Sequence, residues 1–202
     1  MQYQVTLHDT QPCYEGFFKI YAYTVSFDRF TGGQVQQVIR ECGKKHDVVA
    51  VLPYDPVRGE FLLVEQFRIG MLVRGEHPWT LEIVAGFMDV QGEDEVRTAQ
   101  RELFEETGCE AQAVYPMTEY YSGPGGSAAK IKVYLATIDA TTRREFTGII
   151  EEGEDIRVHT VSVKEMYDAV SEGRLNNATS LIAFQQFFMH DWEGKIKQLA
   201  SQ

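Results

Sequence analysis

Residues 86–109 read GFMDVQGEDEVRTAQRELFEETGC, and the second half of this stretch places three glutamates on one face of a predicted helix. Glu102, Glu105 and Glu106 stand at i, i+3 and i+4, which are neighbouring positions on a helix, and Arg101 stands beside them. Like charges at this spacing cost a helix roughly 0.2 to 0.5 kcal/mol per pair, so a counter-charge is favoured. Hard carboxylate oxygens suit Mg²⁺ or Mn²⁺ better than zinc. The pattern therefore predicts a divalent-cation site, with a solvated acidic helix face as the alternative.

The helix itself is expected over residues 95–107. Gly108 follows it as a C-terminal cap. Val96, Ala99, Leu103 and Phe104 recur at helical spacing and form the expected apolar stripe on the side away from the carboxylates.

Composition narrows the class of protein. The chain has 202 residues, enough for one main domain with a smaller attached unit, and a formal net charge of −11 without any Lys/Arg-rich run. This balance argues against a nucleic-acid partner, which needs basic side chains along the phosphate backbone. Three cysteines without a CxxC spacing argue against a disulfide framework and against zinc. No signal pattern and no apolar run near the roughly 18 residues of a membrane span is present, so we expect a cytoplasmic protein without membrane contact.

The pattern of apolar residues changes near residue 46 and predicts two parts. Residues 1–45 alternate over 5–7, 17–27 and 34–41, with a turn at 31–33, and predict a small N-terminal antiparallel β subdomain. Such a unit is marginal alone, so we expect it to pack on a partner subunit in a homodimer; the alternative is that it folds back on its own domain.

Residues 46–202 predict the main domain. Strands are expected at 48–52, where residues 53–56 (PYDP) end the run, and at 61–67, 80–84, 113–121, 131–138 and 156–163. Helices are expected at 164–171 and 178–190 in addition to 95–107. This interspersed order predicts an α/β (α+β) fold with a mixed β-sheet between helices.

The acidic stretch resembles the Nudix box, G-x5-E-x7-R-E-U-x-E-E-x-G-U, where U is apolar. Glu93, the run 101–103, Glu105, Glu106 and Gly108 match it position by position, with Cys109 as the final apolar residue. Six residues separate Gly86 from Glu93 where the pattern has five. Further segments at 14–18, 52–58, 64–68, 81–86, 124–126 and 154–159 are similar to the bacterial ADP-ribose pyrophosphatases of the Nudix superfamily.

This resemblance implies a Nudix fold and Mg²⁺-dependent hydrolysis of ADP-ribose to AMP and ribose 5-phosphate, with Mn²⁺ as a possible replacement. Two alternatives remain: a pyrophosphatase for another nucleoside-diphosphate sugar such as ADP-glucose or GDP-mannose, and a sensor that binds ADP-ribose without hydrolysing it. A sensor would be expected to have a damaged box, whereas the three glutamates are all present.

The resemblance also implies roles for individual residues around the metal. The expected metal ligands are the Ala85 carbonyl, Glu102, Glu106 and Glu154. Glu105 helps as a ligand or outer-shell acceptor, and Arg101 orients it.

The general base is expected in the acidic loop 150–155, where Glu152 matches the family's base and Glu151 is the second choice. Gly153 would allow this loop to close over the substrate. An ordinary solvated turn is the alternative for the loop.

Substrate contacts complete the resemblance. Phe17 and Phe18 are expected at the adenine, Arg40 and Glu41 at the nucleotide, and Arg68 at phosphate, which its planar fork can bind bidentately. The remaining expected contacts are Lys45, where the family often has arginine, and Phe87, Gly123, Pro124 and Gly125 around the diphosphate and terminal ribose. Alternatively, the two phenylalanines are core residues and Arg40 is a surface charge.

One position departs from the family's substrate site. Ala129 stands where close relatives carry a glutamate, which makes the preferred sugar an open question.

Overall fold

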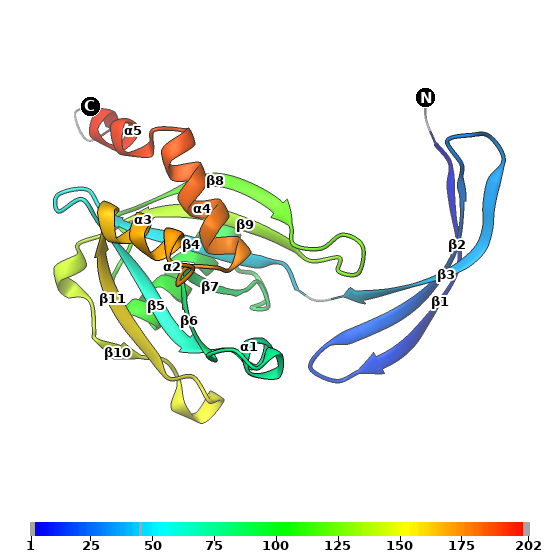
Figure 1. The fold of residues 1–202 in the computed structure, drawn as a ribbon, viewed down its shortest axis with the longest axis horizontal. Helices are drawn as coiled ribbons and strands as arrows, with labels where there is room; N and C mark the ends of the chain where they lie inside the picture. Colours follow the sequence, from blue (N-terminus) through cyan, green and yellow to red (C-terminus); the bar gives the residue numbers. More distant parts are fainter. Residues whose placement is uncertain (1–2, 45, 200–202) are drawn as a thin grey trace. The chain divides into compact units, whose positions relative to one another are not determined.

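A computed structural model describes residues 3–44 and 46–199, apart from the side chains of Lys44 and Glu152. Lys45, one of the expected substrate residues, lies outside the described part of the chain. The chain divides into two compact units, Met1–Asp47 with Tyr121–Lys130, and Val48–Tyr120 with Ile131–Gln202 (Figure 1).

The first unit is an antiparallel sheet of β1 (Val5–Glu15), β2 (Lys19–Asp28) and β3 (Gln34–Lys44), in the order β1-β2-β3. The first strand is longer than the predicted 5–7. Register shifts after Leu7 and Pro12 interrupt the alternation of its residues, so the sequence pattern indicated only the first part of the strand. The predicted turn at 31–33 is confirmed, with Gly32 and Gly33 at φ of 86° and 75°.

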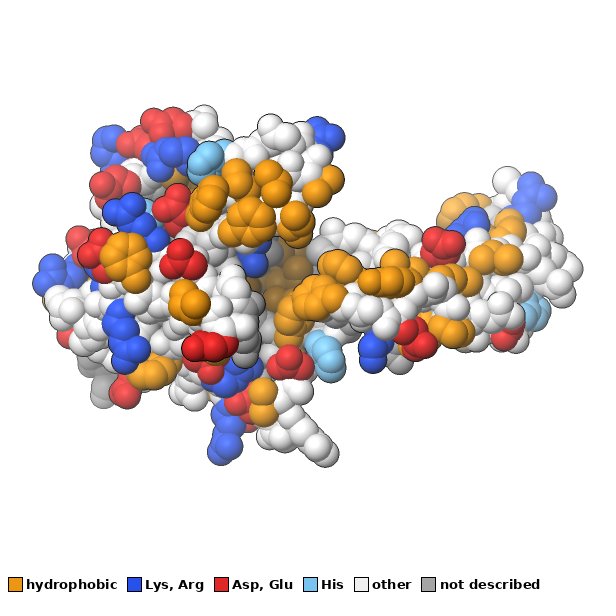
Figure 2. All heavy atoms as spheres, turned by 90° about the horizontal axis from the view of Figure 1, so that it is seen from below, with side chains coloured by type: hydrophobic (Ala, Val, Ile, Leu, Met, Phe, Trp, Pro, Cys, Tyr) orange, Lys and Arg blue, Asp and Glu red, His pale blue; other side chains and the backbone are white. Residues whose placement is uncertain are grey.

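This sheet has almost no core of its own. Among the residues described for the unit, Ser26 alone is buried, and every residue of β1 is exposed. The turn within 121–130 is tied to β3 by two backbone hydrogen bonds, from Gly43 N to Gly126 O at 2.9 Å and from Ala128 N to Gly43 O at 3.0 Å. Figure 2 shows hydrophobic side chains following one another along this unit, as expected for a surface that needs a covering partner.

The second unit is built on an eight-stranded mixed sheet in the order β10-β11-β5-β4-β9-β8, in which β6 pairs with β5 and β7 pairs with β4. Its strands are β4 (Val48–Asp55), β5 (Glu60–Phe67), β6 (Trp79–Glu82), β7 (Val84–Phe87), β8 (Ala113–Tyr121), β9 (Lys130–Thr137), β10 (Phe146–Thr147) and β11 (Ile156–Ser162). The pairing of β4 with β9 is parallel, whereas β4 pairs antiparallel with β5 and β7.

Along one edge, the central strand β4 pairs first with β7 and then with β5, an arrangement called here the fork of β4. Its residues 48–51 pair with β7, and only Tyr54 and Asp55 pair with β5. Pro53 therefore does not end the strand, contrary to the prediction that 53–56 would stop it. It falls between the last partner in β7 and the first in β5, at a place where a missing N–H is tolerated.

Helices cover both faces of this sheet, which confirms the predicted mixed sheet between helices (Figure 1). On one face α2 (Glu95–Thr107) packs with Val49, Val51, Leu62 and Val64. On the other face α3 (Val163–Ser171), α4 (Ala178–Met189) and α5 (Trp192–Leu199) pack with the alternate residues of the same strands, which follows from the two-residue period of a strand. None of the helices described between residues 3 and 199 is long and apolar enough to cross a membrane.

Some elements were not predicted. They are α5, β7, β10, α1 (Ile69–Arg74) and the two 3-10 turns η1 (Ala140–Thr142) and η2 (Ile150–Glu152). The shortest of them carry no periodic signal, and α1 buries none of its residues.

Two of the four residues predicted for the apolar stripe of the acidic helix are buried. Ala99 and Leu103 are fully buried, but Val96 and Phe104 are 41% and 43% exposed. The helix is rotated so that Glu106 faces the sheet, and the Arg144 guanidinium lies 5.5 Å from the centre of the Phe104 ring on the outer side.

Candidate metal and diphosphate site

The acidic helix α2 is fixed at both ends. Asp94 caps its N-terminus by accepting a hydrogen bond from Arg97 N at 2.9 Å, and Gly108, at φ 76°, donates from its N–H to Phe104 O at 2.8 Å. Thr98 and Thr107, within the helix, are fully buried. These anchors hold the carboxylates of the helix in a defined place against β7.

Gly86, in β7, allows a close approach that no other residue permits. A Cβ atom at this position would lie 1.8 Å from Cδ of Glu102 and 1.9 Å from its Oε1. The Glu102 carboxyl therefore occupies the space that a side chain at position 86 would need. This contact joins β7 to the helix α2.

Glu106 is the most buried carboxylate of the site. It is 5% exposed, it is reached by the Ala85 backbone N–H, and its Oε2 atom is buried without a hydrogen-bond partner. Burial, followed by the nearby charges of Glu102 and Glu154, raises the pKa of Glu106 well above its usual value, while Arg68 acts in the opposite direction. A buried carboxyl in this state favours a cationic partner.

Glu102 has a similar environment. Its side chain is 12% exposed, and burial raises its pKa to about 7 against the lowering effect of Arg101. Glu105 and Glu154 add to the rise. Glu105 itself is 40% exposed and points its carboxylate at Arg101.

Arg101 connects four groups around the site. Its Nη1 donates to Glu102 Oε1 at 2.7 Å and to Glu105 Oε2 at 3.1 Å, and its Nε donates to Glu93 Oε2 at 3.1 Å. Its Nη2 donates to the Phe87 carbonyl at 3.4 Å. Arg101 therefore orients Glu102 as well as the expected Glu105, and the Phe87 backbone takes part.

The loop with one extra residue keeps Glu93 within reach of Arg101. Glu93 N donates to Val90 O at 3.2 Å, which closes a turn, and Gly92 in this turn has a φ of 88°. The ion pair between Glu93 and Arg101 therefore forms with six residues between Gly86 and Glu93.

Arg68 lies on the same face of the sheet. Its Nε and Nη2 donate to the two carboxylate oxygens of Glu82 at 3.0 and 2.8 Å, and Thr80 donates to the same carboxylate. The side chain of Arg68 is still 42% exposed, and its charge acts on Glu106 and Glu154. Sequence reasoning found Arg68 but missed Glu82, which holds its fork in place.

The acidic loop 150–155 approaches the carboxylates through Glu154. The charge of Glu154 raises the pKa of both Glu102 and Glu106. The loop is anchored by Thr147 Oγ1, which donates to Glu106 O at 2.6 Å. Glu151 is exposed, and the side chain of Glu152 lies outside what the structure describes.

The residues present fit a divalent cation. Within residues 3–44 and 46–199, no three His, Cys, Asp or Glu side chains are already drawn together as a metal site. However, Glu106 has an unpartnered buried oxygen, the pKa values of Glu102 and Glu106 are both raised, and the available donors are hard oxygens. Ala85 lies within hydrogen-bond reach of Glu106, so its backbone borders the same space.

The other expected substrate residues belong to the first unit. Phe17 and Phe18 are exposed and stack edge to face at 5.1 Å, so neither is a core residue. Phe18 and Glu41 line a cavity of about 440 Å³ with Ser127 and Ala129.

Arg40 and the glycine-rich turn also lie in the first unit. Arg40 donates from Nη1 to the Ile39 carbonyl at 3.0 Å. Gly123 accepts the N–H groups of Gly126 and Ser127 at 3.0 and 2.9 Å, which shapes the turn that contains Pro124 and Gly125.

Comparison with known proteins identifies the family of this chain. The NUDIX domain model matches residues 44–182. An ADP-ribose pyrophosphatase of Escherichia coli (strain K12) is 38% identical over 88% of this chain and 84% of its own length. A GDP-mannose pyrophosphatase of Pectobacterium atrosepticum is 29% identical over 89% of this chain and 91% of its own.

Among solved structures, one described as an ADP compounds hydrolase superposes with a TM-score of 0.70 over 94% of both chains, at 18% identity. This likeness supports the fold. Together with the family model and the sequence relatives, it shows that the chain belongs to the NUDIX domain family, in the branch of the bacterial ADP-ribose pyrophosphatases.

Proposed function

We propose that the protein hydrolyses the diphosphate of ADP-ribose to AMP and ribose 5-phosphate in a reaction that depends on Mg²⁺, which Mn²⁺ can replace. The observation that carries this proposal is a pair of carboxylates, the buried Glu106 and the half-buried Glu102, of which Glu102 lies against Gly86, near the charge of Arg68. The names of the sequence relatives support ADP-ribose as the substrate.

Glu102, Glu106, Glu154 and the Ala85 carbonyl would hold the metal. When bound, a divalent cation supplies a polarised phosphoryl group and a water of lowered pKa. Arg101 orients Glu102 through a 2.7 Å hydrogen bond and Glu105 through one of 3.1 Å, and Glu105 would help as a ligand or as an outer-shell acceptor.

Arg68 binds the diphosphate in this proposal. Glu82 takes two of its five N–H donors, so the guanidinium stays planar and oriented while the remaining donors serve phosphate oxygens. Phe87, whose carbonyl is bonded to Arg101, lies at the edge of the same region.

Glu152 is proposed as the general base, with Glu151 as the second choice. Both belong to η2, which is followed by Gly153 with a φ of 78° and then by Glu154. A base on such a loop can accept a proton once the loop closes over the substrate. Glu152→Gln should lower turnover by roughly two to four orders of magnitude while substrate binding persists, and Glu151→Gln, measured in the same assay, tests the second choice. Near-normal turnover of Glu152→Gln would remove it from the role.

The nucleoside contacts proposed for the first unit are Phe17, Phe18, Arg40, Glu41, Lys45, Gly123, Pro124 and Gly125. The exposed, edge-to-face rings of Phe17 and Phe18 support stacking with adenine.

We also propose a homodimer in which residues 1–45 pack on the partner subunit. The exposed faces of β1 and the single buried residue among those described in this unit support the proposal, since a sheet without a core is not stable alone. Deleting residues 1–45 should abolish both dimerisation and activity, and an active truncated monomer would contradict it.

The cytoplasm is the proposed compartment. Cys13, Cys42 and Cys109 are all free thiols, as expected in a reducing environment.

A second nucleoside-diphosphate sugar is a specific alternative substrate. Ala129 lines the cavity that contains Phe18 and Glu41, and a relative named GDP-mannose pyrophosphatase is 29% identical. The test is hydrolysis of ADP-ribose, ADP-glucose and GDP-mannose with Mg²⁺ or Mn²⁺, following the nucleotide and sugar phosphate. Preference for ADP-ribose would support the main proposal, and preference for another sugar would shift the substrate. Binding of ADP-ribose without turnover would favour the sensor.

A further inference from the structure

A second cavity lies in the Nudix unit, on the opposite face of the sheet from Glu102 and Glu106. It has a volume of about 460 Å³, which is within the usual range for small-molecule sites. Strand β6 separates the two sites: Glu82 binds Arg68 on one face, while Leu81 packs with the core of the other. The cavity is therefore separate from the diphosphate site but shares a strand with it.

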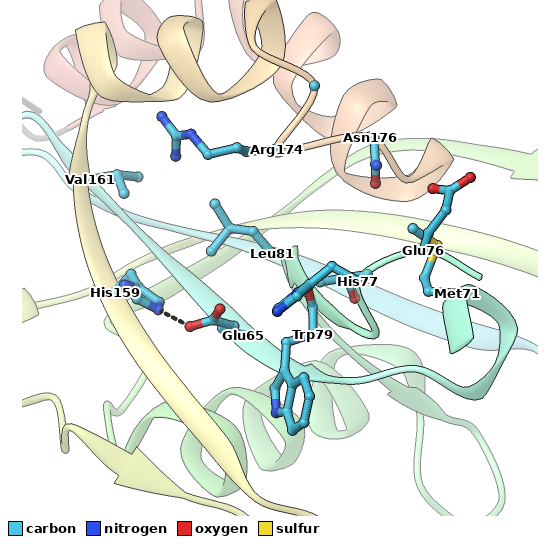
Figure 3. A pocket seen from close by; sticks show the side chains of 12 residues that line it. Glu65, Met71, Glu76, His77, Trp79, Leu81, His159, Val161, Arg174 and Asn176 are labelled. Atoms are coloured by element: carbon cyan, nitrogen blue, oxygen red, sulfur yellow. Dashed lines mark hydrogen bonds and ion pairs between the residues drawn. The ribbon is translucent and has the colours of Figure 1, made fainter. Parts of the chain in front are cut away.

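One end of the cavity is aromatic (Figure 3). Trp79 is 49% exposed, and the His77 ring lies 5.6 Å from its ring at 46°. His77 is held by a 3.2 Å contact between its Nδ1 and the Trp79 carbonyl, and Phe67 supports the indole edge to face at 5.9 Å. A supported, half-exposed indole of this kind can stack with a planar ring.

Hydrogen-bond acceptors stand beside this aromatic end. Glu65 Oε2 lies 2.9 Å from His159 Nε2, and both side chains are 32% exposed inside the cavity. Glu65 has a second carboxylate oxygen, which can accept an N–H from a ring stacked on Trp79. This pairing suits a heterocycle with an amino group better than a plain hydrocarbon ring.

A cation stands on the other side of the cavity. Arg174 enters from the segment between α3 and α4, across Leu81 from Trp79, as Figure 3 shows. Glu172 accepts from its Nε at 2.8 Å, which orients the fork and leaves other donors of the guanidinium for an anion.

We propose that this cavity is a second ligand site, which binds a nucleoside monophosphate with its base on Trp79, a base N–H on Glu65 and its phosphate on Arg174. The choice of AMP as the ligand to test rests on the proposed function, because AMP is the nucleotide that the proposed reaction releases. Occupancy would contact β6, the strand whose Glu82 orients Arg68.

The experiment uses tryptophan fluorescence. The chain has two tryptophans, so Trp192→Phe leaves Trp79 as the sole reporter. AMP is titrated into the full-length variant in EDTA, which prevents metal-dependent binding and turnover. We expect a saturable change in Trp79 fluorescence, and we expect Arg174→Ala in this background to weaken AMP binding about tenfold or more. Arg58→Ala is the matched control, because this arginine lines a different cavity.

Two results would overturn the proposal. One is the absence of a saturable change in the reporter variant while its circular dichroism matches that of the parent. The other is a change that Arg68→Ala removes and Arg174→Ala does not, which would assign AMP to the diphosphate site. Because the titration needs no hydrolysis, failure of the proposed activity would appear separately, in the substrate panel.

Discussion

Glu106→Gln should make the metal-free protein more stable and the metal-loaded protein less stable than the parent. Glu106 is 5% exposed, and its Oε2 has no hydrogen-bond partner. Glu102 and Glu154 add repulsion when they are charged. A buried polar atom without a partner costs roughly 1 to 3 kcal/mol, and more when the group is charged. The neutral amide of Gln removes that charge and so lowers the cost of burial. For a chain of this size that corresponds to a rise in Tm of roughly 3 to 9 °C in EDTA.

Metal should reverse this order. A cation that binds only the folded parent stabilises it by about 2.7 kcal/mol at 100 times its Kd, and Glu106→Gln loses a charged ligand and most of this gain. The assay is thermal unfolding by circular dichroism at pH 7.5, in EDTA and in saturating Mg²⁺. Glu110→Gln, an exposed position just after the helix, is the control and should change neither curve.

The crossing of the two stability orders is the decisive result. If Glu106→Gln is less stable than the parent in EDTA, then the buried Glu106 carboxylate does not lower the free energy of unfolding of the metal-free protein, and the reasoning is refuted. If Mg²⁺ raises the Tm of both proteins equally, Glu106 is not a ligand.

Three further predictions concern the same face. In the metal-free protein the pKa of Glu102 is raised to about 7, so its stabilising contribution is present below about pH 4.5 and is lost as pH rises through 7. Roughly 3 kcal/mol is involved, measured by urea unfolding across this range; a flat profile would contradict the shift. Gly86→Ala should weaken Mg²⁺ binding at least about tenfold, because its Cβ would lie 1.8 Å from Cδ of Glu102; calorimetric titration with parental affinity would refute this contact. Arg101→Lys keeps the charge but cannot bridge Glu93, Glu102 and Glu105 together, so kcat should fall with little change in KM, and an unchanged kcat would deny Arg101 its positioning role.

Spacing along one helix was the part of the site that the sequence could predict. Glu102, Glu105 and Glu106 beside Arg101 follow from helical geometry, and the predicted helix over 95–107 matches α2. Spacing alone could not show that Glu106 turns toward the sheet while Phe104 turns outward, because the rotation of a helix is set by what it packs against.

Contacts between distant elements were beyond the sequence. Glu82 stands opposite Val64 in the antiparallel pair of β5 and β6, so the Arg68 side chain, which follows Phe67, reaches back along the sheet to bind it. No local pattern encodes that register. In the first unit, the attachment of residues 121–130 to β3 likewise depends on backbone bonds that composition does not reveal.

The fork of β4 has a consequence for local unfolding. Because β7 fills the fork, the backbone of residues 84–87 is paired with the central strand, in the register of Ala50 with Ala85. Its amide protons should exchange with solvent only when the whole sheet opens, whereas the short η2 turn of the acidic loop can open by itself. Strand β7, which contains Gly86, and the acidic loop, which contains the proposed base, therefore belong to different cooperative units. A motion of the loop that brings the base to the substrate need not disturb the carboxylates proposed as metal ligands.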